Sequence, residues 1–276
     1  MRFLLGLTSL FFFHFVSSQR GLLDEMEETE KMLAASTKQV NQFFRRFNGE
    51  EDKKGKRLYQ KDRNFQSTSL RKEYLPNLFN QSAGFEEPLI KAFIKRVIDK
   101  RNPLFLDRHK NDWIAEVNAN FKYQGKLVSG LMYLRLEQQG QGYAWVIEDV
   151  SFDFLKSEMK KNLDDHSYFI HPMSHELDFM TLRKAFQKEK NANQYTSKSF
   201  TPDYLSLFLY EIQKENLVFE TIKNVKFHFF VFDHWYFSLA NFNRREYNSG
   251  WLINNLVQFE NSEQKRQMKD YIYDKN

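Results

Sequence analysis

Residues 105–152 constrain the fold more than any other stretch, because apolar and polar side chains alternate along most of it. From Trp113 to Phe121 every second residue is apolar, and amide or charged side chains fill most of the positions between. Successive side chains of a strand point to opposite faces, so this pattern predicts a strand with one apolar face and one solvated face. Glycine-containing turns follow at 124–125 and 138–142. The stretch predicts three antiparallel strands: 113–121, 128–136 and 143–150.

Helical patterns precede these strands. Apolar residues recur from Leu23 to Phe47, with acidic residues first and arginines last, which predicts a long amphipathic helix that stops at Asn48-Gly49. Ser67 is expected to cap a short second helix, and Pro88 suits the first turn of a third. Since a sheet with one apolar face needs a cover, the first half predicts an α+β unit with helices packed on an antiparallel sheet.

The second half repeats this order of elements. Thr201-Pro202 is expected to open a helix, and three further strands are predicted at 225–232, 235–242 and 251–257. A shift of 114 residues places Pro88 on Pro202, and a shorter hairpin places Trp145 on Trp251. We therefore expect a second α+β unit that is a diverged duplicate of the first. The expected segments are a signal peptide at 1–18 and domains at 19–155 and 156–276.

The duplication makes a specific packing prediction for two tryptophans. If they occupy equivalent positions, the ring of Trp145 should lie against Phe93 and Val97. The ring of Trp251 should lie against Leu205 and Leu209.

Four segments of the first half together resemble the nuclear transport factor 2-like superfamily, particularly its exported bacterial members. The segments are QVNQFFRRFNGEE, PLIKAFIKRVID, DWIAEVNANFKYQGK and GYAWVIEDV, and the resemblance covers residues 30–155. It implies an α+β cone in which helices cover the concave face of a strongly curved sheet. Members of this superfamily include dehydratases, isomerases, secretion-apparatus subunits and binding modules, so the resemblance leaves the function open.

The first eighteen residues have the pattern of a signal peptide, with Arg2 ahead of an apolar run and small residues at 17–18. We expect Gln19 to be the mature N-terminus, no transmembrane span after cleavage, and a periplasmic, cell-surface or extracellular protein. The chain has no cysteine, which excludes a thiol nucleophile and a cysteine-ligated metal. A formal net charge of +5, with acidic and basic residues mixed, argues against a nucleic-acid partner.

The histidines and carboxylates of the chain give only weak signals of metal binding or acid–base catalysis. His171 and His175 have the spacing of two metal ligands on a helix, but Pro172 interrupts that helix, so we expect no metal and no cofactor. Asp233-His234 resembles an acid–base pair, although neighbouring strand residues face opposite ways. Glu116 and Glu148 could meet across strands as acid and base, but solvated carboxylates on the outer face are the expected reading.

Aromatic and histidine side chains of the predicted sheets remain as candidates to line a ligand pocket. They are Trp113, Trp145, Trp235, Trp251, His228 and His234. Without a converging set of ionisable groups, catalytic residues are unknown. The expected function is an exported, non-catalytic binding or assembly module for an unknown protein or small molecule. The alternatives are a dehydratase- or isomerase-like enzyme that uses the cone interior and a periplasmic subunit of a secretion apparatus, and a homodimer is compatible with all three.

Overall fold

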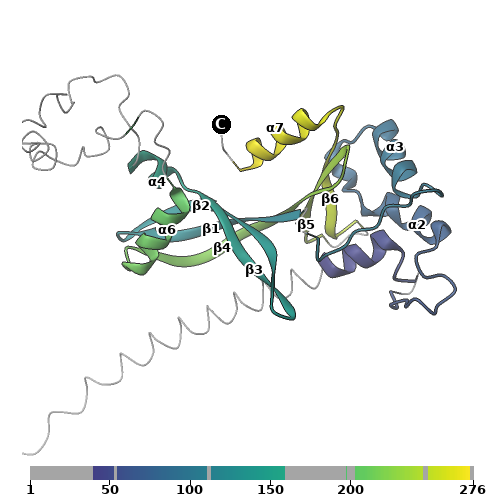
Figure 1. Cartoon of the computed structure of the whole chain (residues 1–276), viewed down its shortest axis with the longest axis horizontal. Coiled ribbons are helices and arrows are strands. Elements are labelled where there is room, and N and C mark those ends of the chain that lie inside the picture. Colours follow the sequence, from purple (N-terminus) through teal and green to yellow (C-terminus); the bar gives the residue numbers. More distant parts are fainter. Residues whose placement is uncertain are drawn as a thin grey trace, which may run out of the picture. The chain divides into compact units, whose positions relative to one another are not determined.

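The computed structural model describes residues 40–52, 55–110, 113–158, 197, 203–244 and 248–273. Residues 40–48 are helical. The other helices are α2 (Thr68–Tyr74), η1 (Leu75–Leu78), η2 (Gln81–Ala83), α3 (Glu87–Val97), α4 (Asp153–Glu158), α6 (Tyr204–Gln213) and α7 (Ser262–Ile272). The strands are β1 (Trp113–Tyr123), β2 (Lys126–Gln139), β3 (Gly142–Ser151), β4 (Leu217–Phe232), β5 (Trp235–Phe242) and β6 (Gly250–Gln258). Figure 1 labels these elements along the chain.

The strands form a six-stranded antiparallel sheet in the order β3-β2-β1-β4-β5-β6, so the α+β class is confirmed. All six predicted strands are present, although β4 begins at Leu217 rather than at 225. Local signals for the helices also hold, since Ser67 accepts a hydrogen bond from the Leu70 amide and Pro88 lies in the first turn of α3. The cap of α6 is Asp203, whose side chain accepts from the Ser206 amide.

Asp233-His234 is the two-residue turn between β4 and β5, not part of a strand. Phe232 and Trp235 are paired across the hairpin, and the backbone carbonyl of His234 accepts a hydrogen bond from the Phe259 amide at 2.8 Å. The exposed side chain of His234 therefore belongs to a turn, and the expectation that strand geometry governs this pair is wrong.

The chain groups into two compact units, each built from separate stretches of sequence. Unit 1 takes its described residues from Met1–Glu116, Leu136–Ala144 and Asn224–Met268. Unit 2 takes its described residues from Val117–Arg135, Trp145–Lys223 and Lys269–Asn276. These units differ from the sequential segments 19–155 and 156–276, whose status as domains stays a prediction, as does the duplication.

Unit 1 has a core of aromatic rings between its helical segments and β5. Phe237 is its centre, being fully buried, and its ring stacks on that of Phe229 at a centroid distance of 4.7 Å. Phe93, from α3, meets Phe237 edge-on at 5.7 Å and Trp235 at 5.2 Å. Aromatic pairs at such separations add to the free energy gained by burial, so this cluster fixes the helices on the sheet.

A buried arginine joins the helix at 40–48 to α2. The side chain of Arg71 is 1% exposed, and it donates hydrogen bonds to the backbone carbonyls of Phe47, at 3.0 Å, and Leu104. Its guanidinium also lies over the Phe105 ring at 4.4 Å. Burial lowers the pKa of Arg71 to about 10, so the group stays charged at neutral pH.

Unit 2 has its own aromatic core, centred on Phe152. This residue is 1% exposed, and its ring contacts the rings of Phe121, Phe154 and Phe208 at 5.4–5.6 Å. Gly130, in β2, lies directly beneath the Phe152 ring, so that a β-carbon at residue 130 would overlap it. The glycine is therefore required for packing, not for a turn.

The two tryptophans lie in different compact units. Trp251 is buried in unit 1 with its ring 4.9 Å from that of Phe227, whereas Leu205 and Leu209 belong to unit 2. Trp145 is only partly buried and belongs to unit 2, whereas Phe93 and Val97 belong to unit 1. The packing predicted for Trp145 and Trp251 stays a prediction.

Within the described ranges, no helix is both long enough and apolar enough to cross a bilayer. The signal peptide at 1–18 and the pair His171 and His175 lie outside these ranges.

Candidate functional site

The end of the first described helix places a carboxylate beside its own last turns. Gly49 adopts a left-handed conformation with φ of +73°, and the Glu50 amide donates to the Arg45 carbonyl at 2.7 Å, which ends the helix and reverses the chain. A tight hairpin follows, closed by the Asp52 amide donating to the Lys56 carbonyl at 2.8 Å. The predicted stop at Asn48-Gly49 is confirmed, and it brings Glu51 back toward the helix.

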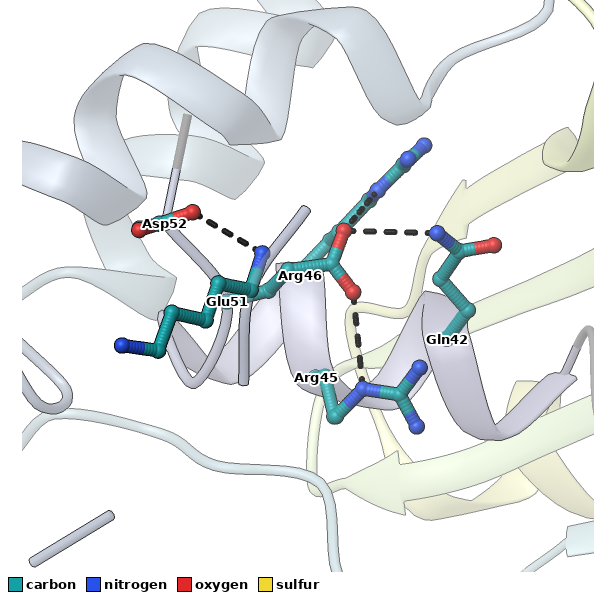
Figure 2. Close-up of polar contacts among 6 residues, drawn as sticks. Gln42, Arg45, Arg46, Glu51 and Asp52 are labelled. Atoms are coloured by element: carbon teal, nitrogen blue, oxygen red, sulfur yellow. Dashed lines mark hydrogen bonds and ion pairs between the residues drawn. The ribbon is translucent and has the colours of Figure 1, made fainter. Parts of the chain in front are cut away.

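Glu51 is the centre of a buried polar network, shown in Figure 2. Its side chain is 1% exposed, and its carboxylate accepts from Arg46 Nε at 2.9 Å, Gln42 Nε2 at 3.3 Å and Arg45 Nε at 3.4 Å. The two arginines remain partly exposed, with 30% and 43% of their side chains accessible. Three donors satisfy this buried charge, so Glu51 holds the hairpin against the end of the helix.

A cavity of about 500 Å³ opens beside this network in unit 1. Its walls come from four segments that are far apart in sequence: the helix at 40–48, the hairpin after it, α2 with η1, and the start of β6. The lining residues are Gln42, Phe43, Arg46, Glu51, Asp52, Gly55, Tyr74, Asn77, Leu78, Ser249, Gly250, Trp251 and Leu252. This volume lies in the usual range for small-molecule sites, so the cavity is our candidate binding site.

Electrostatics at the cavity wall favour a neutral Tyr74. Burial raises the pKa of its phenol, and the carboxylate of Glu51 raises it further, with smaller contributions from Asp52 and Glu73. Only Arg46 acts in the opposite direction on the Tyr74 pKa. The hydroxyl therefore stays protonated at neutral pH and can donate a hydrogen bond in the cavity.

A second polar cluster is formed by side chains of β1, β4 and β5 in unit 1, and none of its residues lines the cavity. His228 Nε2 lies 3.1 Å from a carboxylate oxygen of Glu116, and its Nδ1 lies 2.9 Å from the Tyr236 hydroxyl. A carboxylate only accepts hydrogen bonds, so Nε2 is the donor to Glu116, and the ring links Glu116 to the Tyr236 hydroxyl. Lys226 Nζ donates to the other oxygen of Glu116 at 2.9 Å.

Glu116 therefore does not match the expectation of a solvated outer-face carboxylate. It is buried, because His228 and Lys226 on the neighbouring strand cover it and supply its hydrogen bonds. Glu148 does match a solvated position, since it is exposed and pairs with Arg135 at 3.3 Å within unit 2.

Glu116 should make the stability of the protein depend on pH. Burial opposes ionisation, but hydrogen bonds from His228 and Lys226 outweigh it, so the pKa of Glu116 is lowered from its ordinary 4.5. A lowered folded-state pKa adds stability above about 4.5 that is lost as the pH falls through the folded value. We expect Glu116→Gln to lower the free energy of unfolding by about 1.5–3 kcal/mol at pH 7.

The measurement is urea unfolding of both proteins between pH 7 and pH 3, with exposed Glu86→Gln as the control. The difference between wild type and Glu116→Gln should shrink below pH 4.5. A difference that stays constant down to pH 3 would contradict the ion-pair account.

The structure separates the pocket candidates into three groups. Trp251 lines the cavity. Trp113, Trp235 and His228 are buried, the first stacked on Phe229 at 5.3 Å, the second against Phe93, and the third in the Glu116 cluster. Trp145 and His234 are not among the residues that line this cavity. Sequence reasoning missed the lining residues Arg46, Glu51 and Tyr74, for which the only signal was the paired arginines before Asn48-Gly49.

Together, the fold and this site define an α+β protein with one polar cavity described in unit 1. No family model, no curated protein and no solved structure matches the chain.

Proposed function

We propose that the protein is a non-catalytic binding module that takes a small polar ligand in the unit 1 cavity. The observation that carries this proposal is the lining itself, in which hydrogen-bonding side chains from four segments surround a space of about 500 Å³. Sites of this kind, which are largely formed before the ligand arrives, bind without a large ordering cost.

The way in which the charged groups of the cavity are used supports a non-catalytic role. Glu51 accepts from three donors, and Asp52 accepts from the Lys56 amide at 2.9 Å. A general base needs a free lone pair within reach of the substrate proton, and a buried carboxylate with three donors is a poor candidate for that role. Tyr74, with its raised pKa, is a hydrogen-bond donor at neutral pH and not a base.

The proposal includes export, which the signal-peptide pattern of residues 1–18 supports. It also includes a fold of the nuclear transport factor 2-like type, which the resemblance of four segments of the first half supports. An enzyme or a subunit of a secretion apparatus could have the same fold class. The properties of the cavity, and not the fold, therefore distinguish these alternatives from a binding module.

The test is a thermal-shift screen of the purified protein against a panel of amino acids, sugars, nucleosides and organic acids. A ligand at about 100 times its Kd adds about 2.7 kcal/mol to the free energy of unfolding, which is readily measured. We expect at least one compound to stabilise the wild type and to be recovered unchanged. Ser249→Trp, which puts an indole at the cavity wall, should abolish the effect, whereas Ser262→Trp, at the exposed start of α7, should not.

Two results would count against the proposal. Chemical conversion of the stabilising compound would show an enzyme. Equal stabilisation of the wild type and Ser249→Trp, or no stabilisation by any compound, would remove the cavity as the binding site.

A further inference from the structure

The amide side chains of the cavity wall offer acceptors to a ligand. Gln42 donates through Nε2 to Glu51 at 3.3 Å, and Asn77 donates through Nδ2 to the Glu73 carbonyl at 3.3 Å. Each amide thereby keeps its carbonyl oxygen for another partner, because an amide carries a carbonyl acceptor as well as its two N–H donors. Both residues line the cavity.

Donors occupy the same walls. Tyr74 and Ser249, whose side chains end in hydroxyl groups, line the cavity, and Arg46 uses Nε for its bond to Glu51. Within the described part of the chain, no hydrogen bond of the Arg46 Nη groups is observed. The cavity therefore presents donors and acceptors close together, and a hydroxyl group, which both donates and accepts, is complementary to such a surface.

The charges of the lining work against an anionic ligand. Among the described lining residues Arg46 is the cationic side chain, and its Nε is paired with Glu51, while Asp52 adds a second carboxylate. With two carboxylates to one arginine among the described lining residues, a ligand carboxylate or phosphate would find only the Nη groups of Arg46 as a charged donor.

One part of the wall is apolar. Phe43, Leu78, Trp251 and Leu252 contribute to the lining, and all four are buried hydrophobic residues of the core. Aromatic and aliphatic side chains of this kind suit the C–H face of a saturated ring, while its hydroxyl groups point to the polar wall.

We propose that the ligand of this cavity is an uncharged, hydroxyl-rich saturated ring, that is, a neutral carbohydrate. This inference rests on the proposed function, since it names the class of ligand for the same site. The neutral pyranose matches both walls: its hydroxyl groups satisfy the interspersed donors and acceptors, and it brings no charge to a lining that already has two carboxylates.

The test compares three probes that share one six-membered ring: D-glucose, D-glucuronate and tetrahydropyran. Binding to the full chain is followed by isothermal titration calorimetry at pH 7. Glucose should bind, glucuronate should bind at least about tenfold more weakly because of its carboxylate, and tetrahydropyran, which has no hydroxyl groups, should not bind measurably.

Two variants identify the groups involved. Tyr74→Phe keeps the ring and removes the donor, and Asn77→Ala removes an acceptor; each should weaken glucose binding roughly two- to tenfold. Tyr59→Phe, at an exposed tyrosine outside the cavity lining, is the matched control and should bind as the wild type does.

Tighter binding of glucuronate than of glucose, binding of tetrahydropyran, or unchanged affinity in both variants would overturn the carbohydrate assignment. The assignment would also fail if other panel compounds stabilise the wild type but not Ser249→Trp while glucose does not bind, and in that case the binding-module proposal would stand. If no compound of the panel, glucose included, binds the wild type, both the carbohydrate assignment and the binding-module proposal are wrong.

Discussion

Replacing Phe237 by alanine should lower the free energy of unfolding by about 3–5 kcal/mol. The side chain is fully buried in unit 1, and its ring lies within 6.4 Å of five other rings: those of Phe43, Phe47, Phe93, Phe229 and Phe232. Because these rings come from three separate elements, the helix at 40–48, α3 and β4, the surrounding structure cannot collapse into the cavity that the substitution leaves. The loss is a large part of the 5–15 kcal/mol that typically holds a domain folded.

Urea unfolding followed by tryptophan fluorescence measures this effect. Tyr271→Ala is the control, since it removes an aromatic ring that is 71% exposed and should change the unfolding midpoint very little. A midpoint for Phe237→Ala close to that of Tyr271→Ala would show that the aromatic cluster is not the core of unit 1.

Adding a single methyl group at Gly130 should lower the free energy of unfolding by about 1–3 kcal/mol or more. In Gly130→Ala the new β-carbon overlaps the ring of Phe152, and that ring cannot move away because Phe121, Phe154 and Phe208 pack around it. Phe152 must therefore leave its position, or β2 must bend.

A double-mutant cycle separates this steric effect from a change in strand propensity. In the background of Phe152→Ala the ring is gone, so the additional cost of Gly130→Ala should nearly disappear. Gly142→Ala is the matched control in β3, because a β-carbon there meets only the Gln139 carbonyl at 3.9 Å. An equal cost of Gly130→Ala with and without Phe152 would refute the packing explanation.

The sequence predicted the elements whose signals are local. Alternation over eight or more residues located β1, β2 and β3, and the caps at Ser67 and Pro88 located two helices, because these patterns reflect the contacts of each segment alone. The first part of β4 was missed because Val218, Phe219 and their neighbours are largely exposed and show no clean alternation.

Features that depend on distant residues were not predictable from one sequence. Helix α7 buries only Ile272 within its length, so its pattern has no apolar stripe. The pair of Glu116 and His228 is separated by 112 positions, and the reading of Glu116 as solvated failed because nothing local to β1 indicates what covers it. The cavity was missed for the same reason: its walls come from four separate segments, of which only Trp251 had been singled out.

The most direct test of the binding cavity is the position of a bound compound relative to the four tryptophans of the chain. In a ¹H–¹⁵N spectrum each indole N–H gives one resonance, which single Trp→Phe variants assign. Trp251 is the tryptophan among the lining residues, and its indole nitrogen is buried without a hydrogen-bond partner in the described structure, so its resonance should respond to a change in the cavity. Titration with a compound that stabilises the wild type should shift the Trp251 resonance with the same Kd as the thermal stabilisation and leave those of Trp113, Trp145 and Trp235 in place. A stationary Trp251 resonance, with shifts at another tryptophan, would contradict the account.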